Sequence, residues 1–278
     1  MSSNDTQLGR VSALTPQPHG LSLRAITNGV REPPVPTSPA DRLRLENLNS
    51  FLLAAPVLLF SMVAHEYAHG YAALKQGDPT AQQLGRLTWN PVKHIDPFMT
   101  VLMPAMLFIL SKGSFIFGGA KPVPVNPRNY RNYKRGDVIV SLAGVTTNLL
   151  LFPVFAILII GLGLLGRAIP GAVNTLSLLQ TMMWQGVIFN LVLAFFNLIP
   201  IPPLDGSHVM KYLLPPAWAL RYQQMARYGI LILLVMLWTD AGKNVLSVIM
   251  LPVTALGQPT FELVLPYFLK SPYEMGIR

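Results

Sequence analysis

The sequence predicts an all-α polytopic membrane protein: a transmembrane helix bundle with a small membrane-associated β element. Of the 278 residues, 51% are hydrophobic and only 12% are charged. The apolar residues gather into uncharged stretches long enough to cross a hydrocarbon layer about 30 Å thick. Because a soluble fold of this length rarely needs such stretches, composition favours a multi-pass membrane protein.

The formal net charge of +9 indicates topology rather than a nucleic-acid partner. No basic stripe interleaved with aromatic residues, of the kind that follows a phosphate backbone, is present in the sequence. The basic residues lie between apolar segments, from Arg128 to Arg135 and from Lys211 to Arg227, as the positive-inside tendency predicts for cytoplasmic loops. The absence of cysteine excludes disulfides and thiolate ligands, so a bound metal would need His, Asp or Glu.

The chain is expected to divide into a flexible tail over 1–47 and a membrane-embedded domain over 48–278. The tail is rich in Ser, Pro, Asn and Arg and has no sustained apolar period, which is typical of disorder. The first span is predicted at about 51–74, where the stretch from Phe51 to Ala64 carries no charge. Pro56 lies within this span and would bend its helix.

The elements that follow the first span are less regular. The apolar segment at about 97–112 is short for a spanning helix, so a re-entrant or surface segment is expected. Phe115–Val125 contains β-branched and aromatic residues broken by Gly and Pro, which suits an edge strand or extended hairpin. The remaining spans are predicted at about 138–165, 182–204 and 230–253. Asp240 and Lys243 interrupt the last one, so a bent helix and two short helices both stay open.

The pentapeptide His65-Glu66-Tyr67-Ala68-His69 matches the pattern H-E-x-x-H. Histidines four residues apart face one side of a helix and can bind one zinc ion together. Glu66 would lie beside the zinc-activated water and take its proton during attack on a peptide carbonyl. At about 1.5 Å per residue, His65 lies about 21 Å along the helix from Phe51, inside the bilayer. These side chains would be costly in hydrocarbon unless they faced a protein cavity and met a partner.

A catalytic zinc site needs a third protein ligand, and a carboxylate is the natural choice where cysteine is absent. Asp205 follows an apolar span in a stretch where three prolines prevent a regular helix, so its side chain can project from unwound backbone into a cavity. Asp240 is the alternative, but Lys243 lies three residues later and can neutralise it. His94 and His208 lie in loops, where structural hydrogen bonds are the more common role.

Three separated motifs resemble the site-2 protease family of intramembrane zinc proteases, also called peptidase family M50. The first is the H-E-x-x-H pattern at 65–69, on a membrane helix. The second is NLIPIPPLDG at 197–206, which resembles the family's N-x-x-P-x-P-x-L-D-G pattern. The third is AGVTTN at 143–148, which resembles a Gly-Pro-x-x-Asn element with Val145 in place of the proline.

The resemblance implies a set of site residues and one Zn²⁺ per chain. It implies that Asp205 is the third ligand beside His65 and His69, and that Glu66 is the catalytic base. Asn148 and Asn197 are implied to contact the substrate, Asn148 through an amide that steadies the oxyanion or the substrate backbone. An interhelical hydrogen bond for Asn148 and a helix-terminating amide for Asn197 stay open as alternatives.

The resemblance also implies partners and a location. The segment 117–126 is similar to the family's extended segment, whose open edge pairs with an unwound substrate by strand addition. The expected partners are single-span membrane protein substrates and the lipid bilayer, with no nucleic acid, and the oligomeric state is left open. The expected site opens towards the cytoplasmic side of a prokaryotic plasma (inner) membrane. No loop is long enough for a PDZ domain, so a compact member is expected.

Two other functions are compatible with these motifs. A catalytically silent relative would bind transmembrane partners without cutting them, although a base and three metal ligands are all present. A zinc transporter would also place His and Asp within the membrane. It would need neither Glu66 beside the metal nor a strand edge for a peptide.

Overall fold

The computed structural model describes residues 39–110, 118–271 and 277. The chain divides into two units, Met1–Arg42 and Leu43–Arg278, and all contacts described below lie within the second. Every regular element of the described residues is a helix, which confirms the all-α prediction. The first helix begins at Pro39, earlier than the boundary at residue 48 expected from composition.

The helices are, in chain order, α1 (Pro39–Gln76), α2 (Thr80–Gln83), η2 (Pro91–His94), η3 (Pro97–Leu102), α3 (Met103–Leu110), η4 (Pro127–Asn129), α4 (Tyr133–Ala168), η5 (Pro170–Ala172), α5 (Val173–Asn197), α6 (Asp205–Met210), α7 (Pro216–Gln224), α8 (Ala226–Trp238), α9 (Asp240–Ile249), α10 (Leu251–Val264) and η6 (Leu265–Tyr267).

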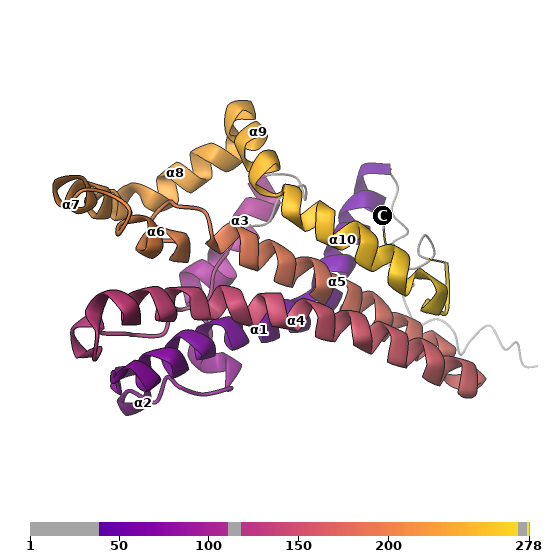
Figure 1. Ribbon diagram of the computed structural model, residues 1–278. Coiled ribbons are helices and arrows are strands. Elements are labelled where there is room, and N and C mark those ends of the chain that lie inside the picture. Colours follow the sequence, from indigo (N-terminus) through magenta and orange to yellow (C-terminus); the bar gives the residue numbers. More distant parts are fainter. Residues whose placement is uncertain (1–38, 111–117, 272–276, 278) are drawn as a thin grey trace, which may run out of the picture. The chain divides into compact units, whose positions relative to one another are not determined.

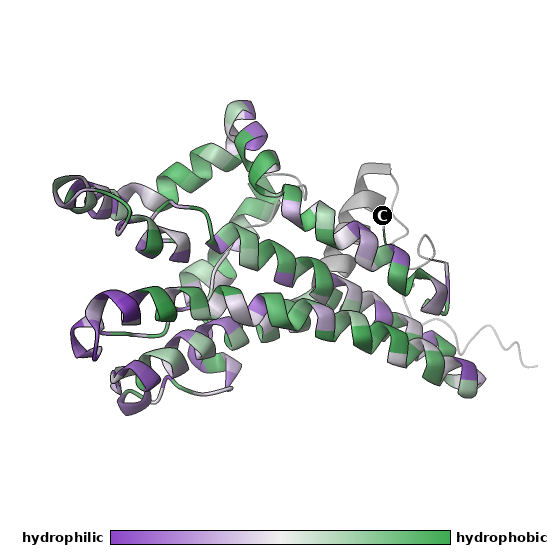
Figure 2. Cartoon of the chain, in the orientation of Figure 1, coloured by the Kyte–Doolittle hydropathy of each residue, from purple (hydrophilic) through white to green (hydrophobic). Residues whose placement is uncertain are grey.

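Three helical stretches are long and apolar enough to cross a membrane: Leu52–Gln76, Tyr133–Ala168 and Pro170–Asn197. A fourth candidate is the pair α8 and α9, which bends by 96° between Trp238 and Asp240. Figure 2 shows apolar residues along most of α4, α5 and α8. Several apolar helices of this length are typical of a multi-pass membrane protein.

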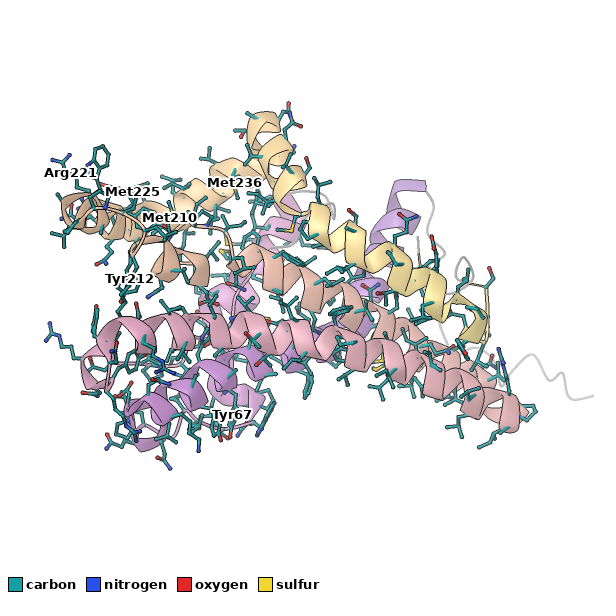
Figure 3. All side chains as sticks on the ribbon, viewed as in Figure 1. Tyr67, Met210, Tyr212, Arg221, Met225 and Met236 are labelled. Carbon is teal, nitrogen blue, oxygen red and sulfur yellow. The ribbon has the colours of Figure 1, made fainter. Side chains whose placement is uncertain are left out.

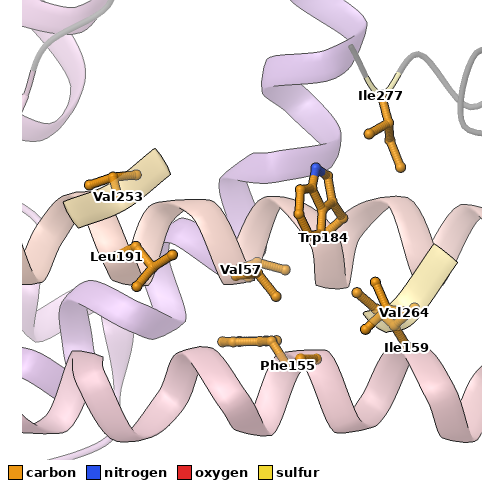
Figure 4. Close-up of a cluster of buried hydrophobic side chains, with 10 residues drawn as sticks. Val57, Phe155, Ile159, Trp184, Leu191, Val253, Val264 and Ile277 are labelled. Carbon is orange, nitrogen blue, oxygen red and sulfur yellow. The ribbon is translucent and has the colours of Figure 1, made fainter. Parts of the chain in front are cut away.

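Helices α4 and α5 pack side by side (Figure 1) and form the core together with the first span. Val57 from α1 meets Phe155 and Ile159 from α4 in one buried cluster with Trp184 and Leu191 from α5 (Figure 4). A methyl group on Gly186 would lie 2.8 Å from Phe155 and from Val57. Lipid tails are as apolar as these side chains, so close packing around small residues holds the helices together.

The third span begins earlier than the sequence indicates. The stretch predicted as a loop before residue 182 is mostly helical, because η5 begins at Pro170 and α5 at Val173. Its polar side chains are satisfied internally: Gln180 donates to the carbonyls of Ile159 and Tyr267 at 3.0 and 2.9 Å. The polar residues at the start of α5 therefore led to a predicted span that begins too late. The regular helix also ends at Asn197, before the prolines of the predicted 182–204 span.

The short apolar segment over Pro97–Leu110 consists of a π-helical turn followed by α3. Of the predicted edge strand at 115–125, residues 115–117 lie outside the described residues, and the rest forms neither helix nor strand. Its N–H groups bind other parts of the protein, since Lys121 donates to the His94 carbonyl at 2.8 Å. Two prolines, at 122 and 124, offer no N–H for pairing. The β element is thus not present in the described residues.

Candidate metal centre

Three side chains from two distant parts of the chain converge on one point. His65 and His69 lie one turn apart on α1, and Asp205 is the first residue of α6. Asp205 Oδ2 lies 3.1 Å from His65 Nε2 and 3.3 Å from His69 Nε2, and the two Nε2 atoms are 3.0 Å apart. These three residues form a group that can hold a metal ion.

The geometry of this group suits a zinc ion. A tetrahedral ion with ligands at about 2.0–2.1 Å separates its ligand atoms by about 3.3 Å, close to the three distances observed. Asp205 Oδ2 is buried and has no hydrogen-bond partner among the described residues. A buried carboxylate oxygen without a donor is costly, so a cation facing it would satisfy this atom.

The remaining ring nitrogens of both histidines are engaged by α4. His69 Nδ1 lies 2.7 Å from the carbonyl oxygen of Val140, and His65 Nδ1 lies 2.5 Å from Asn148 Oδ1. Each acceptor favours a proton on Nδ1, which leaves the Nε2 lone pair for a metal. Helix α4 thereby fixes the orientation of both imidazoles.

Gly144 of α4 lies directly against both imidazole rings. A methyl group there would lie 2.5 Å from His65 Nε2 and 2.5 Å from His69 Nε2. Only a residue without a Cβ atom fits so close to two imidazole rings. The sequence placed Gly144 in a motif but gave no reason for the glycine, because the contact joins helices that are distant in sequence.

Glu66 lies between the two histidines, and its side chain contacts the segment that follows α3. Oε2 of its carboxylate accepts a hydrogen bond of 2.7 Å from the backbone N–H of Val123. The carboxylate is half-buried and is held in place by backbone, since the N–H points at it from a separate part of the chain. This contact joins distant parts of the chain and could not be predicted from the sequence pattern.

Asp78 anchors the segment that carries Val123. Its fully buried carboxylate accepts hydrogen bonds from the Asn126 N–H at 2.6 Å, from Asn129 Nδ2 at 2.8 Å, and from the N–H and hydroxyl of Thr80. Burial alone would raise the pKa of this carboxyl, but the hydrogen bonds from Asn126, Thr80 and Asn129 lower the pKa below its ordinary value of 3.8.

Asp78→Asn should lower the thermal midpoint of the detergent-solubilised protein at pH 7. The substitution replaces one acceptor oxygen, which faces N–H donors, by an NH₂ group, and this loss costs about 1–3 kcal/mol of unfolding free energy. The pKa of the folded carboxyl lies below its ordinary value, so its stabilisation is complete above pH 3.8 and is lost as the pH falls through the folded pKa. Unfolding scans should therefore show the two proteins converging below pH 3.8. A difference that persists at acid pH would contradict this account.

A second polar cluster fixes α6, the helix that carries Asp205. Asp137, at the start of α4, is paired with Lys211 Nζ at 2.5 Å and accepts from the Tyr212 hydroxyl at 2.9 Å. Figure 3 shows Tyr212 between the end of α6 and the start of α4. His208 Nδ1 also faces this carboxylate, at 3.4 Å.

The other candidate ligands have structural contacts away from the cluster. His94 is fully buried, and its Nε2 lies 2.9 Å from the carbonyl oxygen of Thr88. Asp240 is exposed and pairs with Lys243 at 3.5 Å, as the sequence indicated.

The two asparagines expected to contact a substrate are otherwise engaged. Asn148 is fully buried between His65 and Asn190, which corresponds to the interhelical alternative. Asn197 is half-buried, and its Nδ2 donates to the Leu193 carbonyl of its own helix at 2.8 Å. Substrate-side roles for Asn148 and Asn197 stay predictions.

Comparison with known proteins identifies the family. Residues 53–238 match Peptidase family M50. YwhC of Bacillus subtilis is 40% identical over 189 residues, which cover 68% of this chain and 81% of that protein. Rip2 of Mycolicibacterium smegmatis is 31% identical over 207 residues, 73% of each chain. Both carry the name "Putative zinc metalloprotease". No solved structure gives a significant match.

The match covers the helix with both histidines, the element at 143–148 and the stretch that ends in Asp205. The family predicted from the three motifs is therefore confirmed. The chain belongs to Peptidase family M50, the site-2 protease family.

Proposed function

We propose that this protein is an intramembrane zinc endopeptidase, which cuts peptide bonds within the transmembrane segments of other proteins. The observation that carries the proposal is the convergence of His65, His69 and Asp205 beside Glu66, on a helix long and apolar enough to span a membrane. Membership of a peptidase family supports a hydrolytic role for this cluster. One zinc ion per chain is proposed, held by the two imidazoles and the carboxylate.

The proposed mechanism divides the work between the metal and Glu66. Bound zinc would supply a Lewis acid that polarises the scissile carbonyl and makes water acidic enough to react. A carboxylate oxygen of Glu66 takes the proton of the attacking water and gives it to the leaving amine nitrogen. The N–H of Val123 holds the Glu66 carboxylate by a hydrogen bond, and the acceptors on α4 keep both Nε2 atoms aimed at one point.

The proposed substrates are single-span membrane proteins cut in regulated intramembrane proteolysis. A substrate helix hides its carbonyls in its own hydrogen bonds, so it must unwind locally before hydrolysis. Asn197 and the non-helical residues 118–126 are proposed to contact the unwound segment. Strand addition at this edge would be restricted, because Lys121 and Val123 already use their N–H groups and the intervening Pro122 has none.

The proposed location is the plasma (inner) membrane of a prokaryote, with the site opening towards the cytoplasm. Basic residues flank the site at the start of α4 and after α6, from Arg128 to Arg135 and from Lys211 to Arg227. This distribution follows the positive-inside tendency.

The proposal is tested by separating metal binding from proteolysis. Glu66→Gln should retain stoichiometric zinc but lose cleavage of a single-span substrate in detergent by about 10²–10⁴-fold, because the amide cannot accept the proton of water. His65→Ala and Asp205→Ala should lose zinc and cleavage together, since each removes a ligand. Zinc is measured on the purified protein by elemental analysis, and cleavage by gel electrophoresis.

The same variants distinguish the other two functions. A folded wild-type protein that holds zinc but cuts no membrane substrate supports a silent relative. Zinc uptake into proteoliposomes that survives Glu66→Gln supports a transporter. Full cleavage by Glu66→Gln would refute the role assigned to this carboxylate.

A further inference from the structure

Buried polar side chains connect His65 to the interior of α5. His65 Nδ1 contacts Asn148 Oδ1 at 2.5 Å, and Asn148 Nδ2 donates to Asn190 Oδ1 at 2.8 Å. Asn190 Nδ2 donates to the Ser61 hydroxyl at 2.8 Å, and that hydroxyl donates to the Val57 carbonyl at 2.9 Å. Ser61, Asn148 and Asn190 are each 0% exposed, so no solvent competes for these bonds.

The direction of this hydrogen-bond chain is set by a backbone carbonyl. Asn190 lies 2.8 Å from the carbonyl oxygen of Gly186, which can only accept, so Asn190 must turn its NH₂ group towards it. Its Oδ1 then faces Asn148, which must answer with its own NH₂ group. Asn148 Oδ1 is thereby left to face His65 Nδ1, and this acceptor places the proton of His65 on Nδ1.

The proton position decides which nitrogen of each histidine is free. With the proton on Nδ1, the Nε2 lone pair of His65 faces His69 Nε2 and Asp205. His69 reaches the same state directly, since its Nδ1 faces the Val140 carbonyl at 2.7 Å. His94 shows the reverse arrangement, because there Nε2 faces a backbone carbonyl, at 2.9 Å.

We propose that Asn190 is a positioning residue for the metal centre, which sets the tautomer and ring orientation of His65 by fixing the amide of Asn148. This inference rests on the proposed function, in which His65 is a zinc ligand. Asn190 itself is hydrogen-bonded to Asn148, Ser61 and Gly186, and not to the three metal ligands. Such outer partners hold a ligand in its metal-binding form, and their loss typically weakens metal affinity by about 10–100-fold.

The test measures zinc affinity of the purified full chain in detergent, by competition with a chelator. Asn190→Leu should weaken zinc binding by about 10–100-fold, because the Asn148 amide is then free to turn an N–H towards His65. Gln180→Leu is the matched control. Gln180 is also a fully buried amide on α5 bonded to backbone carbonyls, so its loss should lower the thermal midpoint and leave zinc affinity unchanged.

A second substitution distinguishes the positioning role of Asn190 from a general effect on folding. An ionised carboxylate at position 148 offers only acceptor atoms to His65, whichever way it turns. Asn148→Asp in the Asn190→Leu background should therefore restore zinc affinity, whereas a merely structural role predicts no recovery. If Asn190→Leu does not fold, Asn190→Ser replaces it, because a hydroxyl keeps the bond to the Gly186 carbonyl but does not reach Asn148.

The outcomes distinguish this inference from the proposed function. Zinc affinity equal to wild type in the Asn190 variant, or no recovery with Asn148→Asp, overturns the positioning role of Asn190. Both results leave the zinc site and the Glu66 test intact. Absence of zinc from the folded wild-type protein overturns the proposed function, and with it the positioning role of Asn190.

Discussion

Gly144→Ala should abolish high-affinity zinc binding and cleavage together, although it adds only a methyl group to a helix. The added Cβ would lie 2.5 Å from His65 Nε2 and 2.5 Å from His69 Nε2, far inside van der Waals contact. Either α4 must move away, which breaks the hydrogen bonds that orient both imidazole rings, or the rings must leave the metal position. Since losing an outer partner alone typically costs about 10–100-fold in affinity, we expect a loss of at least about 100-fold.

Gly161→Ala is the matched control for this prediction. Gly161 lies on the same helix, and apart from its own neighbours in the helix no described atom is within 4 Å of the place its Cβ would take. Alanine is favoured over glycine within a helix by about 1 kcal/mol, so this variant should be slightly more stable and bind zinc normally. Zinc affinity and thermal midpoints of both variants make the comparison. Normal zinc binding by Gly144→Ala would show that α1 and α4 do not approach as described.

The zinc motif could be read from the sequence because its geometry is local. His65 and His69 share a helix face through the repeat of the helix alone, and Glu66 lies between them. Asp205 comes from another element, and its assignment needed the prolines before it and the family pattern. The structure brings its carboxylate to within 3.3 Å of both histidines.

The supporting contacts could not be predicted, because they depend on how distant helices meet. Gly144, Asn190 and Val123 each act on the site across a contact between separate elements. A polar residue in an apolar helix indicates a buried partner but does not identify it. Asn148 illustrates this, since the same amide suits a substrate backbone or a neighbouring helix.

The helix boundaries differed from prediction for a related reason. The predicted span began only at residue 182, after the polar Gln180, yet the amide of Gln180 also accepts from the N–H of Leu269 at 3.0 Å, beyond α10. A side chain satisfied by distant backbone groups loses its polar cost. The predicted edge strand is absent from the described residues for the opposite reason. β-Branched residues between prolines are also compatible with an irregular segment, which here is held by contacts such as the hydrogen bond from Val123 to Glu66.

Asp137→Asn should destabilise the protein strongly and weaken zinc binding from a distance. Asp137 and Lys211 have side chains only 3% and 10% exposed, and removing one partner of a buried ion pair costs about 3–5 kcal/mol, because the other charge stays buried. At about 2–4 °C per kcal/mol for a chain of this size, the thermal midpoint should fall by about 10 °C. Zinc affinity should fall as well, since Lys211 and Asp205 belong to the same short segment around α6.

The exposed pair of Asp240 and Lys243 provides the control, because the same change there removes an ion pair of similar chemistry in water. Their side chains are 97% and 57% exposed, so Asp240→Asn should change stability by less than about 0.5 kcal/mol. The double variant Asp137→Leu with Lys211→Met should recover most of the loss, since apolar residues of similar volume replace a buried pair at little cost. A midpoint for Asp137→Asn equal to that of Asp240→Asn would show that the Asp137 pair does not hold α6 against α4.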